Sequence, residues 1–439
     1  MQLVCCADFG STFTKTLLVS LDDAEVVAAA EHPTTIDTDV LDGLRACQDQ
    51  LVRSVPRAAD APVRACSSAG GGLRIAVVGN EDLVTAEAGR RVALSSGGRV
   101  VHVGAGGLDD GRRAAVRTSE PDVVLLVGGT DGGNADVLVQ SAEALRAWSG
   151  PVVVAGNAAA TDRVTEILDA GDVPFDVAAN VVPRIGVLAP ESARASIRTA
   201  FLRHVIGGKH LSASDEFVDM VEGPTPDVVL TGAELLADLA GDVAVVDVGG
   251  ATTDVHSVVD VDPEDAELSR QVVAPTRVSR TVEADLGMHW SARTTVERGV
   301  DAGLLTDADA TIDDLRLAEV AVAIALRRHA GRQRVVLGPD GRVVERTGKD
   351  LREIRLLVGS GGVLRHARTV DAELVLWAST GPDVEGGWQL PRSPRLVVDR
   401  AYVLAAVGLL APSRPEVATR LLRRHLAPGP PGGTAADTA

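Results

Sequence analysis

Two short stretches of this chain carry carboxylates, glycines and hydroxyl residues in the same order. The first reads ADFGSTFTK from Ala7, and the second reads DVGGATTD from Asp247. In each, an apolar run ends at an aspartate, small residues follow, and a second apolar run begins. Glycine lets backbone N–H groups approach an anion closely, and threonine hydroxyls add donors. Because a strand-end aspartate can hold a metal ion or its waters, the pattern predicts phosphate and metal binding.

The two stretches can be aligned residue by residue. The matched pairs are Asp8 with Asp247, Gly10 with Gly249, Ser11 with Gly250, and Thr14 with Thr253. One such stretch alone could be an ordinary hairpin whose polar side chains make local turn bonds. Two copies half a chain apart favour a duplicated domain with a ligand between the halves. Lys15 adds a compact ammonium suited to phosphate, and it is one of three lysines among 43 basic residues.

A third glycine-rich stretch, RLLVGSGGVLRH, spans Arg355–His366. Here an apolar strand is expected to end at Gly359, Ser360 and Gly361, before a helix. A flat group such as adenine or ribose could lie against this floor, because no side chains block it. The same stretch could be an ordinary turn of an α/β sheet. Its position after two phosphate-type hairpins favours nucleotide contact.

Composition excludes several classes of protein. The net charge of −18, from 61 acidic and 43 basic residues, argues against nucleic acid as a partner. None of the four cysteines, Cys5, Cys6, Cys47 and Cys66, forms a CxxC pair, so neither a zinc site nor a disulfide framework is predicted. The apolar segment 401–411 is too short to span a bilayer. We therefore expect a cytoplasmic protein that binds no membrane.

The surrounding elements indicate an α/β protein in which the order of predicted strands and helices changes at residue 73. Three strands, a helix and a fourth strand at Pro62–Ser67 are expected before it. Strands alternate with helices after it, which indicates a parallel sheet. Later strands are expected at Asp227–Leu230 and Val272–Val278, and a helix at Leu315–Ala330. The expected divisions are 1–72 for the first half of an N-terminal lobe, 73–190 for an inserted α/β region, 191–240 for the rest of that lobe, 241–412 for a C-terminal lobe, and 413–439 for a helix and a disordered tail.

These motifs resemble those of a known superfamily. DFGSTFTK, DVGGATTD and VGSGG are similar to the two phosphate motifs and the adenosine motif of the actin, heat-shock chaperone and sugar-kinase ATPases. Within that superfamily, LLVGGTDGGN, VVVAGN, RTVEADLGM and SRPEVATRLLRRHL resemble the glutamate mutase L family. The likeness covers nearly the whole chain. That family is one of reactivating proteins that accompany adenosylcobalamin-dependent carbon-skeleton mutases.

The resemblance implies a fold of two ribonuclease H-like domains, with an inserted α/β subdomain, that close on ATP and Mg²⁺. It implies that Asp8 and Asp247 hold magnesium through its waters and orient the attacking water. The residues implied to bind the phosphates are Gly10, Ser11, Thr12, Thr14 and Lys15 from one side, and Gly249, Gly250, Thr252 and Thr253 from the other. Gly359, Ser360 and Gly361 are implied to contact the adenosine. The implied partner is a mutase whose damaged cofactor is exchanged as ATP hydrolysis moves the lobes.

Three alternatives remain open at this stage. DFGSTFTK also resembles the start of the activators of 2-hydroxyacyl-CoA dehydratases, but the second half of this chain lacks their cluster-binding cysteines. A small-molecule kinase of the same fold would need a catalytic base and a polar pocket that the sequence does not reveal. A filament-forming nucleotide-binding protein is the third.

Two further expectations concern partners. Asp254 and His256 begin a cobalamin-type Asp-x-His-x-x-Gly pattern, but Val259 replaces the glycine, so we predict no cobalt ligation by His256. The loop Gly128–Asn134 lies outside the inferred nucleotide cleft, and our hypothesis for it is partner contact.

Overall fold

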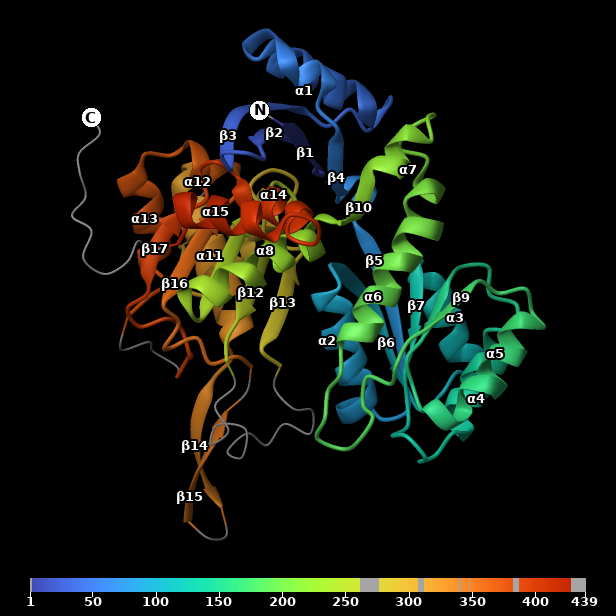
Figure 1. The fold of residues 1–439 in the computed structure, drawn as a ribbon. Helices are drawn as coiled ribbons and strands as arrows, with labels where there is room; N and C mark the ends of the chain where they lie inside the picture. The colour runs from blue at the N-terminus through green and yellow to red at the C-terminus, as the bar shows by residue number, and fades with distance from the viewer. Residues whose placement is uncertain are drawn as a thin grey trace.

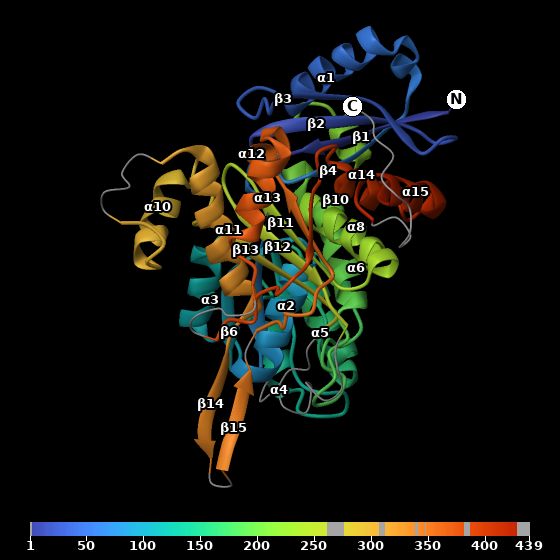
Figure 2. The same cartoon turned by 90° about the vertical axis from the view of Figure 1, so that its left-hand side faces the viewer.

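The computed structural model describes residues 2–260, 276–306, 312–338, 341–346, 348–381 and 387–427. Within these residues the chain forms three five-stranded sheets, which we call the first, second and parallel sheets, and one separate hairpin. The hairpin, β14 (Gln333–Gly338) with β15 (Gly341–Arg346), extends away from the rest of the molecule (Figure 1, Figure 2).

The first and second sheets repeat one topology. The first has the order β10 (Val221–Pro224), β4 (Val63–Ser67), β1 (Leu3–Phe9), β2 (Phe13–Ser20), β3 (Glu25–Pro33). The second has the order β13 (Val278–Glu283), β12 (Thr253–Val258), β11 (Val243–Val248), β16 (Leu356–Ser360), β17 (Arg395–Val398). In each, the first three strands in sequence are antiparallel, the fourth pairs in parallel with the first, and the fifth pairs in parallel with the fourth. The fold is therefore the predicted pair of ribonuclease H-like domains.

The parallel sheet is inserted between β4 and β10 of the first sheet. Its order is β6 (Gly98–Ala105), β5 (Leu73–Gly79), β7 (Val123–Leu126), β8 (Val152–Val154), β9 (Phe175–Val177), and every neighbouring pair is parallel. The helices between its strands are α2 (Glu87–Ser95), α3 (Asp110–Thr118), α4 (Asp136–Ala144) and α5 (Thr161–Asp169). Such a sheet needs a crossover helix after each strand, which explains the alternation seen from residue 73.

The remaining helices lie outside these crossovers. They are α1 (Val40–Ser54), α6 (Glu191–Ala200), α7 (Glu216–Met220), α8 (Thr225–Ala240), α10 (Ala292–Asp301), α11 (Asp314–Ala330), α12 (Gly362–His366), α13 (Thr369–Trp377), α14 (Val403–Leu410) and α15 (Pro415–His425). One of them, α6, packs against β8 and β9 of the parallel sheet. The helix predicted at Leu315–Ala330 is α11. The start of the strand predicted at Val272–Val278 lies outside the described residues, and β13 begins at Val278.

The strand predicted at Asp227–Leu230 is wrong, because this segment lies in α8. An apolar run of three residues has no period of its own, so it can be read as a buried strand or as one turn of a buried helix. Pro226 in the first turn of α8 favours the helix, since its missing N–H would have no helical partner there. The acidic Asp227 in the same turn suits the helix dipole.

Helices α8, α14 and α15 lie between the first and second sheets (Figure 1). One apolar cluster joins Val4 of the first sheet, Val245 of the second, Leu236 of α8, Val407 of α14 and Leu421 of α15. A second cluster joins the first sheet to the parallel sheet. The two sheets with matching topology therefore share a helical layer, which holds their strand ends, and hence the two hairpins, on the same side.

Candidate nucleotide site

The two phosphate-type hairpins have the same geometry. In the first, Gly10 N donates to Phe13 O at 3.1 Å, and in the second Gly249 N donates to Thr252 O at 2.9 Å. A Cβ added to Gly10 would lie 2.7 Å from the first of these oxygens, and one on Gly249 would lie 2.9 Å from the second. Both glycines are therefore required by the same tight turn.

The strand pairing shows a further equivalence between the two hairpins. Asp8 pairs with Lys15 across β1 and β2, and Asp247 pairs with Asp254 across β11 and β12. Lys15 and Asp254 consequently occupy matching positions with opposite charges. Neither the aspartate at 254 nor its match with Lys15 was part of the predicted site.

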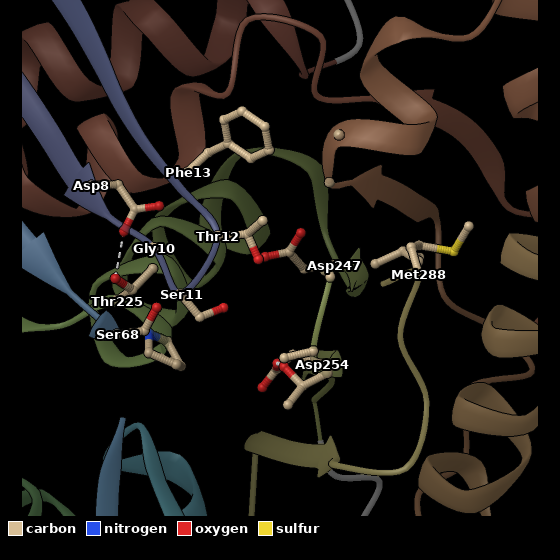
Figure 3. Close-up of a pocket in the computed structure, with 18 of the residues that line it drawn as sticks. Asp8, Gly10, Ser11, Thr12, Phe13, Ser68, Thr225, Asp247, Asp254 and Met288 are labelled. Atoms are coloured by element: carbon tan, nitrogen blue, oxygen red, sulfur yellow. Dashed lines mark hydrogen bonds between the residues drawn. The ribbon is translucent and has the colours of Figure 1, made fainter. Parts of the chain in front are cut away.

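The hairpins meet at one cavity of about 930 Å³ between the first and second sheets. Figure 3 shows Asp8, Gly10 and Ser11 on one side of it and Asp247, Asp254 and Met288 on the other. The predicted residues that line it are Asp8, Gly10, Ser11, Thr12, Lys15, Asp247, Gly249, Gly250, Thr252 and Gly361. Three segments that lie far apart in the sequence thus surround one space large enough for a small-molecule ligand.

Four predicted residues do not line the cavity. Thr14 and Thr253 are fully buried, and their hydroxyls contact Thr34 Oγ1 at 3.3 Å and Leu286 O at 3.1 Å. Gly359 lies inside β16, where an added Cβ would meet leucine side chains within 3.0 Å. Ser360 is buried beside Asp247 in the sheet register. These four residues therefore pack beneath the glycine-rich loops and do not face the cavity.

The tips of the two hairpins touch. A Cβ at Gly250 would lie 2.7 Å from Thr12 Oγ1, so a larger residue there would collide with the other hairpin. The Thr12 hydroxyl oxygen is buried without a hydrogen-bond partner in the described part of the chain. A buried hydroxyl that faces a cavity without a partner is available to a ligand.

Asp8 is held by donors from distant parts of the chain. Its Oδ1 accepts from Thr225 Oγ1 at 2.5 Å, and its Oδ2 accepts from the Tyr402 hydroxyl at 3.0 Å. Lys15 Nζ lies 3.8 Å from Oδ2. Asp8 is 3% exposed, so these contacts offset the cost of burying its carboxyl group.

The surroundings of Asp247 differ from those of Asp8. Burial raises the pKa of Asp247 to about 6, Lys15 opposes this rise, and the Asp254 and Asp8 carboxylates add to it. Crowded carboxylates at a cavity wall favour a cation there. Within the described residues no three acidic, histidine or cysteine side chains converge as a metal cage. One or two carboxylates beside a phosphate ligand are the usual setting for Mg²⁺, so these residues fit that ion.

Asp254 is fixed by Arg280. Arg280 Nε and Nη2 donate to Asp254 Oδ1 at 2.9 and 2.5 Å, and Thr252 Oγ1 donates to Asp254 Oδ2 at 3.0 Å. Arg280 Nη1 also donates to Leu94 O at 3.1 Å and Gly98 O at 2.9 Å, beside the parallel sheet. Arg280 lies in the strand β13.

His256 lies opposite Arg280 in the sheet and is 1% exposed. Burial and the nearby Arg280 charge lower its pKa well below the usual value, so its ring is neutral at pH 7. The absence of cobalt ligation by His256 stays a prediction.

The glycine loop after β16 packs on the second hairpin. Gly361 has φ +101°, and a Cβ there would lie 2.1 Å from Val248 O, so only glycine fits. The adjacent Gly362, Val363 and His366 also line the cavity, together with Met288 on the far wall. Gly361 and its neighbours are thus placed to contact a ligand in this cavity.

The loop Gly128–Asn134 does not line the cavity. Its Asp131 Oδ1 accepts from Asn180 Nδ2 at 2.9 Å and from Ala158 N at 3.0 Å. Asp131 thus ties this loop to the turns after β8 and β9. Partner contact by this loop remains a hypothesis, which full mutase reactivation by a Thr130→Ala, Asp131→Ala variant would contradict.

Comparison with solved structures gives matches of low similarity. A nucleotide-free acetone carboxylase is 15% identical with a TM-score of 0.39, covering 93% of this chain and 70% of that one. A xylulose kinase from Lactobacillus acidophilus is 11% identical with a TM-score of 0.34, covering 98% of this chain and 93% of that one. Neither likeness carries information about activity.

In the described residues, no helix combines the length and the apolar character needed to cross a membrane.

Sequence comparison gives a closer match. The curated Protein MutL from Clostridium tetanomorphum is 34% identical over 461 aligned residues, which cover 97% of this chain and 99% of the relative. A family model described as MutL protein matches residues 4–313 and 304–426. Since both matches span nearly the whole chain, it belongs to the MutL protein family, the glutamate mutase L family that its motifs resemble.

Proposed function

We propose that this protein is an ATP-dependent reactivating chaperone for an adenosylcobalamin-dependent carbon-skeleton mutase of the glutamate mutase type. ATP hydrolysis drives movement of the lobes, and that movement promotes exchange of the damaged cofactor. The observation that carries the proposal is the pair of equivalent hairpins that meet at one cavity between two matching sheets. Membership of the MutL family supports the choice of partner.

The chain's own residues divide the work between the two sheets. Asp8 and Asp247 would hold magnesium, which supplies neutralisation of phosphate charge when it is bound with ATP. Lys15, the Thr12 hydroxyl and the backbone amides near Gly250 provide donors to the phosphates. Asp247, once ionised, is the group placed to orient a water molecule. Because donors come from both hairpins, loss of a phosphate would weaken the link between the two sheets.

The burial of the thiols in this chain argues for a reactivating chaperone rather than for a dehydratase activator. All four cysteines are free and buried. Burial raises the pKa of the Cys5 thiol to about 12 and that of the Cys47 thiol to about 11, so these groups stay protonated. An iron–sulfur cluster shared between subunits needs exposed thiolates. We also propose that the protein works in the cytoplasm, where its thiols would remain reduced.

The first test is ATP binding and hydrolysis by the purified protein. We expect magnesium-dependent hydrolysis that falls about 100-fold or more in Asp8→Ala and in Asp247→Ala, since each removes an electrostatic contact to the phosphates. Asp110→Ala, whose side chain is 97% exposed on α3, is the matched control and should keep the parent rate. A parent protein that binds no nucleotide would contradict the proposal.

The second test addresses the partner. A glutamate mutase loaded with cyanocobalamin is mixed with the protein and adenosylcobalamin, and recovery of mutase activity is followed. We expect recovery with ATP but not with a non-hydrolysable analogue, and no recovery with the Asp247→Ala variant. Equal recovery without ATP would contradict the coupling of hydrolysis to exchange.

A further inference from the structure

Tyr402 has an unusual backbone conformation at the start of α14. Its φ is +56°, a left-handed conformation that bulky residues rarely adopt. Tyr402 N donates to Asp399 O at 3.2 Å, and the Asp399 carboxylate accepts from the next two backbone amides at 2.8 and 3.0 Å. Asp399 N donates to Gly359 O at 2.8 Å. The surrounding contacts therefore hold this strained residue against the second sheet.

The side chain of Tyr402 reaches the first hairpin. Its hydroxyl donates to Asp8 Oδ2 at 3.0 Å, and Lys15 Nζ lies 4.0 Å from the centre of its ring. The residue is 6% exposed. A phenol carries its proton at neutral pH, so this hydroxyl is the donor and the Asp8 carboxylate is the acceptor.

We propose that Tyr402 is a positioning residue, which sets the Asp8 carboxylate and the Lys15 ammonium for phosphate and magnesium binding. The inference rests on the proposed ATPase function and names a residue that neither the sequence motifs nor the family match assigns. One aromatic ring supplies two different contacts. Its hydroxyl orients a carboxylate, and its face holds a cation by a cation–π interaction.

The position of Tyr402 makes this more than local packing. Asp8 and Lys15 lie on β1 and β2 of the first sheet, whereas Tyr402 is fixed through Asp399 to the second sheet. The contact therefore ties the first hairpin to the opposite half of the molecule. A ring without a hydroxyl would fill the same space but would leave one Asp8 oxygen without this donor.

Two substitutions separate the two contacts. Tyr402→Phe removes the hydroxyl and keeps the ring, so kcat should fall about tenfold with little change in the KM for ATP, and more Mg²⁺ should be needed for half-maximal rate. Tyr402→Leu removes both contacts, so the KM for ATP should rise as well. Trp388→Leu is the control, because it removes the cation–π pair with Arg332, at 3.8 Å, outside the cavity lining.

A spectroscopic readout is independent of catalysis. Tyr402 is the only tyrosine in the chain, so labelling with tyrosine carrying ¹³C at Cζ yields one resonance. We expect that resonance to move in Asp8→Asn, because the charged acceptor of the phenol's hydrogen bond is gone. It should stay in place in Trp388→Leu.

The outcomes are distinguishable. The inference would be overturned if a folded Tyr402→Phe variant had the same kinetic constants as the parent protein. It would also be overturned if the tyrosine resonance kept its chemical shift in Asp8→Asn. A loss of rate in Trp388→Leu equal to that in Tyr402→Phe would also overturn it, since both would then reflect general destabilisation. A parent protein without ATPase activity would contradict the proposed function, while the resonance would still decide whether Tyr402 holds Asp8.

Discussion

At the scale of single residues, the two matching aspartates have different surroundings. Both oxygens of Asp8 accept hydrogen bonds from protein side chains, those of Thr225 and Tyr402. Asp247 instead has its pKa raised to about 6 by burial, with a contribution from Asp254. The first carboxylate is thus held in place by the protein, and the second carries an electrostatic cost that a bound cation would relieve.

This difference predicts a stability effect with a defined pH dependence. The raised pKa means that the folded protein holds a proton on Asp247 that the unfolded chain, with a pKa near 3.8, has lost. Stability therefore decreases as pH rises from about 4 to 6, and the loss is complete above 6. Asp247→Asn should raise the free energy of unfolding by up to about 3 kcal/mol at pH 7.5.

Urea unfolding at two pH values checks this prediction. The advantage of Asp247→Asn should be smaller at pH 5 than at pH 7.5, and Asp110→Asn should show no such difference. An advantage of the same size at both pH values would contradict the assignment of the raised pKa to Asp247.

At the scale of elements, helices α8 and α14 cross at glycines. A Cβ on Gly408 of α14 would lie 1.9 Å from Val228 O, and one on Gly232 of α8 would lie 2.5 Å from Leu404 O. The two backbones therefore touch with no side chain between them. This close crossing fixes α14, and with it Tyr402, relative to the first turn of α8, which carries Thr225.

Gly408→Ala should consequently destabilise the protein by about 3 kcal/mol, the upper part of the range for overpacking, because the contact is with backbone rather than with a flexible side chain. Gly208→Ala, where an added Cβ meets no atom within 4 Å, is the control and should change stability by less than about 0.5 kcal/mol. Thermal unfolding of both variants provides the comparison. An unchanged melting temperature for Gly408→Ala would show that the helices can separate freely.

Most elements of this fold could be predicted from the sequence wherever apolar residues recur with a single period, that of a strand or that of a helix. The strands around Asp8 and Asp247 and the helix α11 have clear apolar patterns and clear ends. The strand predicted at Asp227–Leu230 was wrong because four residues are too few to show a helical period. Over the whole of α8 the polar residues Asp227, Thr231, Glu234 and Asp238 do recur with that period.

At the scale of the whole molecule, Arg280 joins the second sheet to the parallel sheet. It is 4% exposed and binds Asp254 on one side and the Leu94 and Gly98 carbonyls on the other. Thr252 of the second hairpin donates to the same Asp254 carboxylate. The inserted subdomain is thereby connected to a residue that lines the cavity between the first and second sheets.

Arg280→Gln should loosen this connection. Removal of one partner of a buried ion pair leaves Asp254 without its counter-charge, which costs about 3–5 kcal/mol of stability. Hydrogen–deuterium exchange should increase at residues 94–99 and 278–283. Arg293→Gln, whose side chain is 93% exposed, should leave exchange in both segments unchanged. Increased exchange confined to 278–283 would indicate that other contacts hold the parallel sheet in place.

The candidate site was predictable only where its residues are consecutive in the chain. The hairpin residues carry a local pattern, and the cavity brings most of them together. Tyr402, Thr225 and Arg280 reach their partners over long sequence separations, 394 residues in the case of Tyr402 and Asp8. Such contacts depend on how the sheets pack, and no spacing in the sequence encodes them.

The opposite charges at Lys15 and Asp254 have a consequence for symmetry. Two identical halves, such as the subunits of a homodimer, would present the same residue at both positions, so their shared cleft would look alike from either side. A polyphosphate could then enter in two equivalent orientations. In this single chain each half is encoded separately, so one position is a cation and the other an anion. The equivalence of the two halves is thereby broken at the cavity, and the cleft acquires one direction.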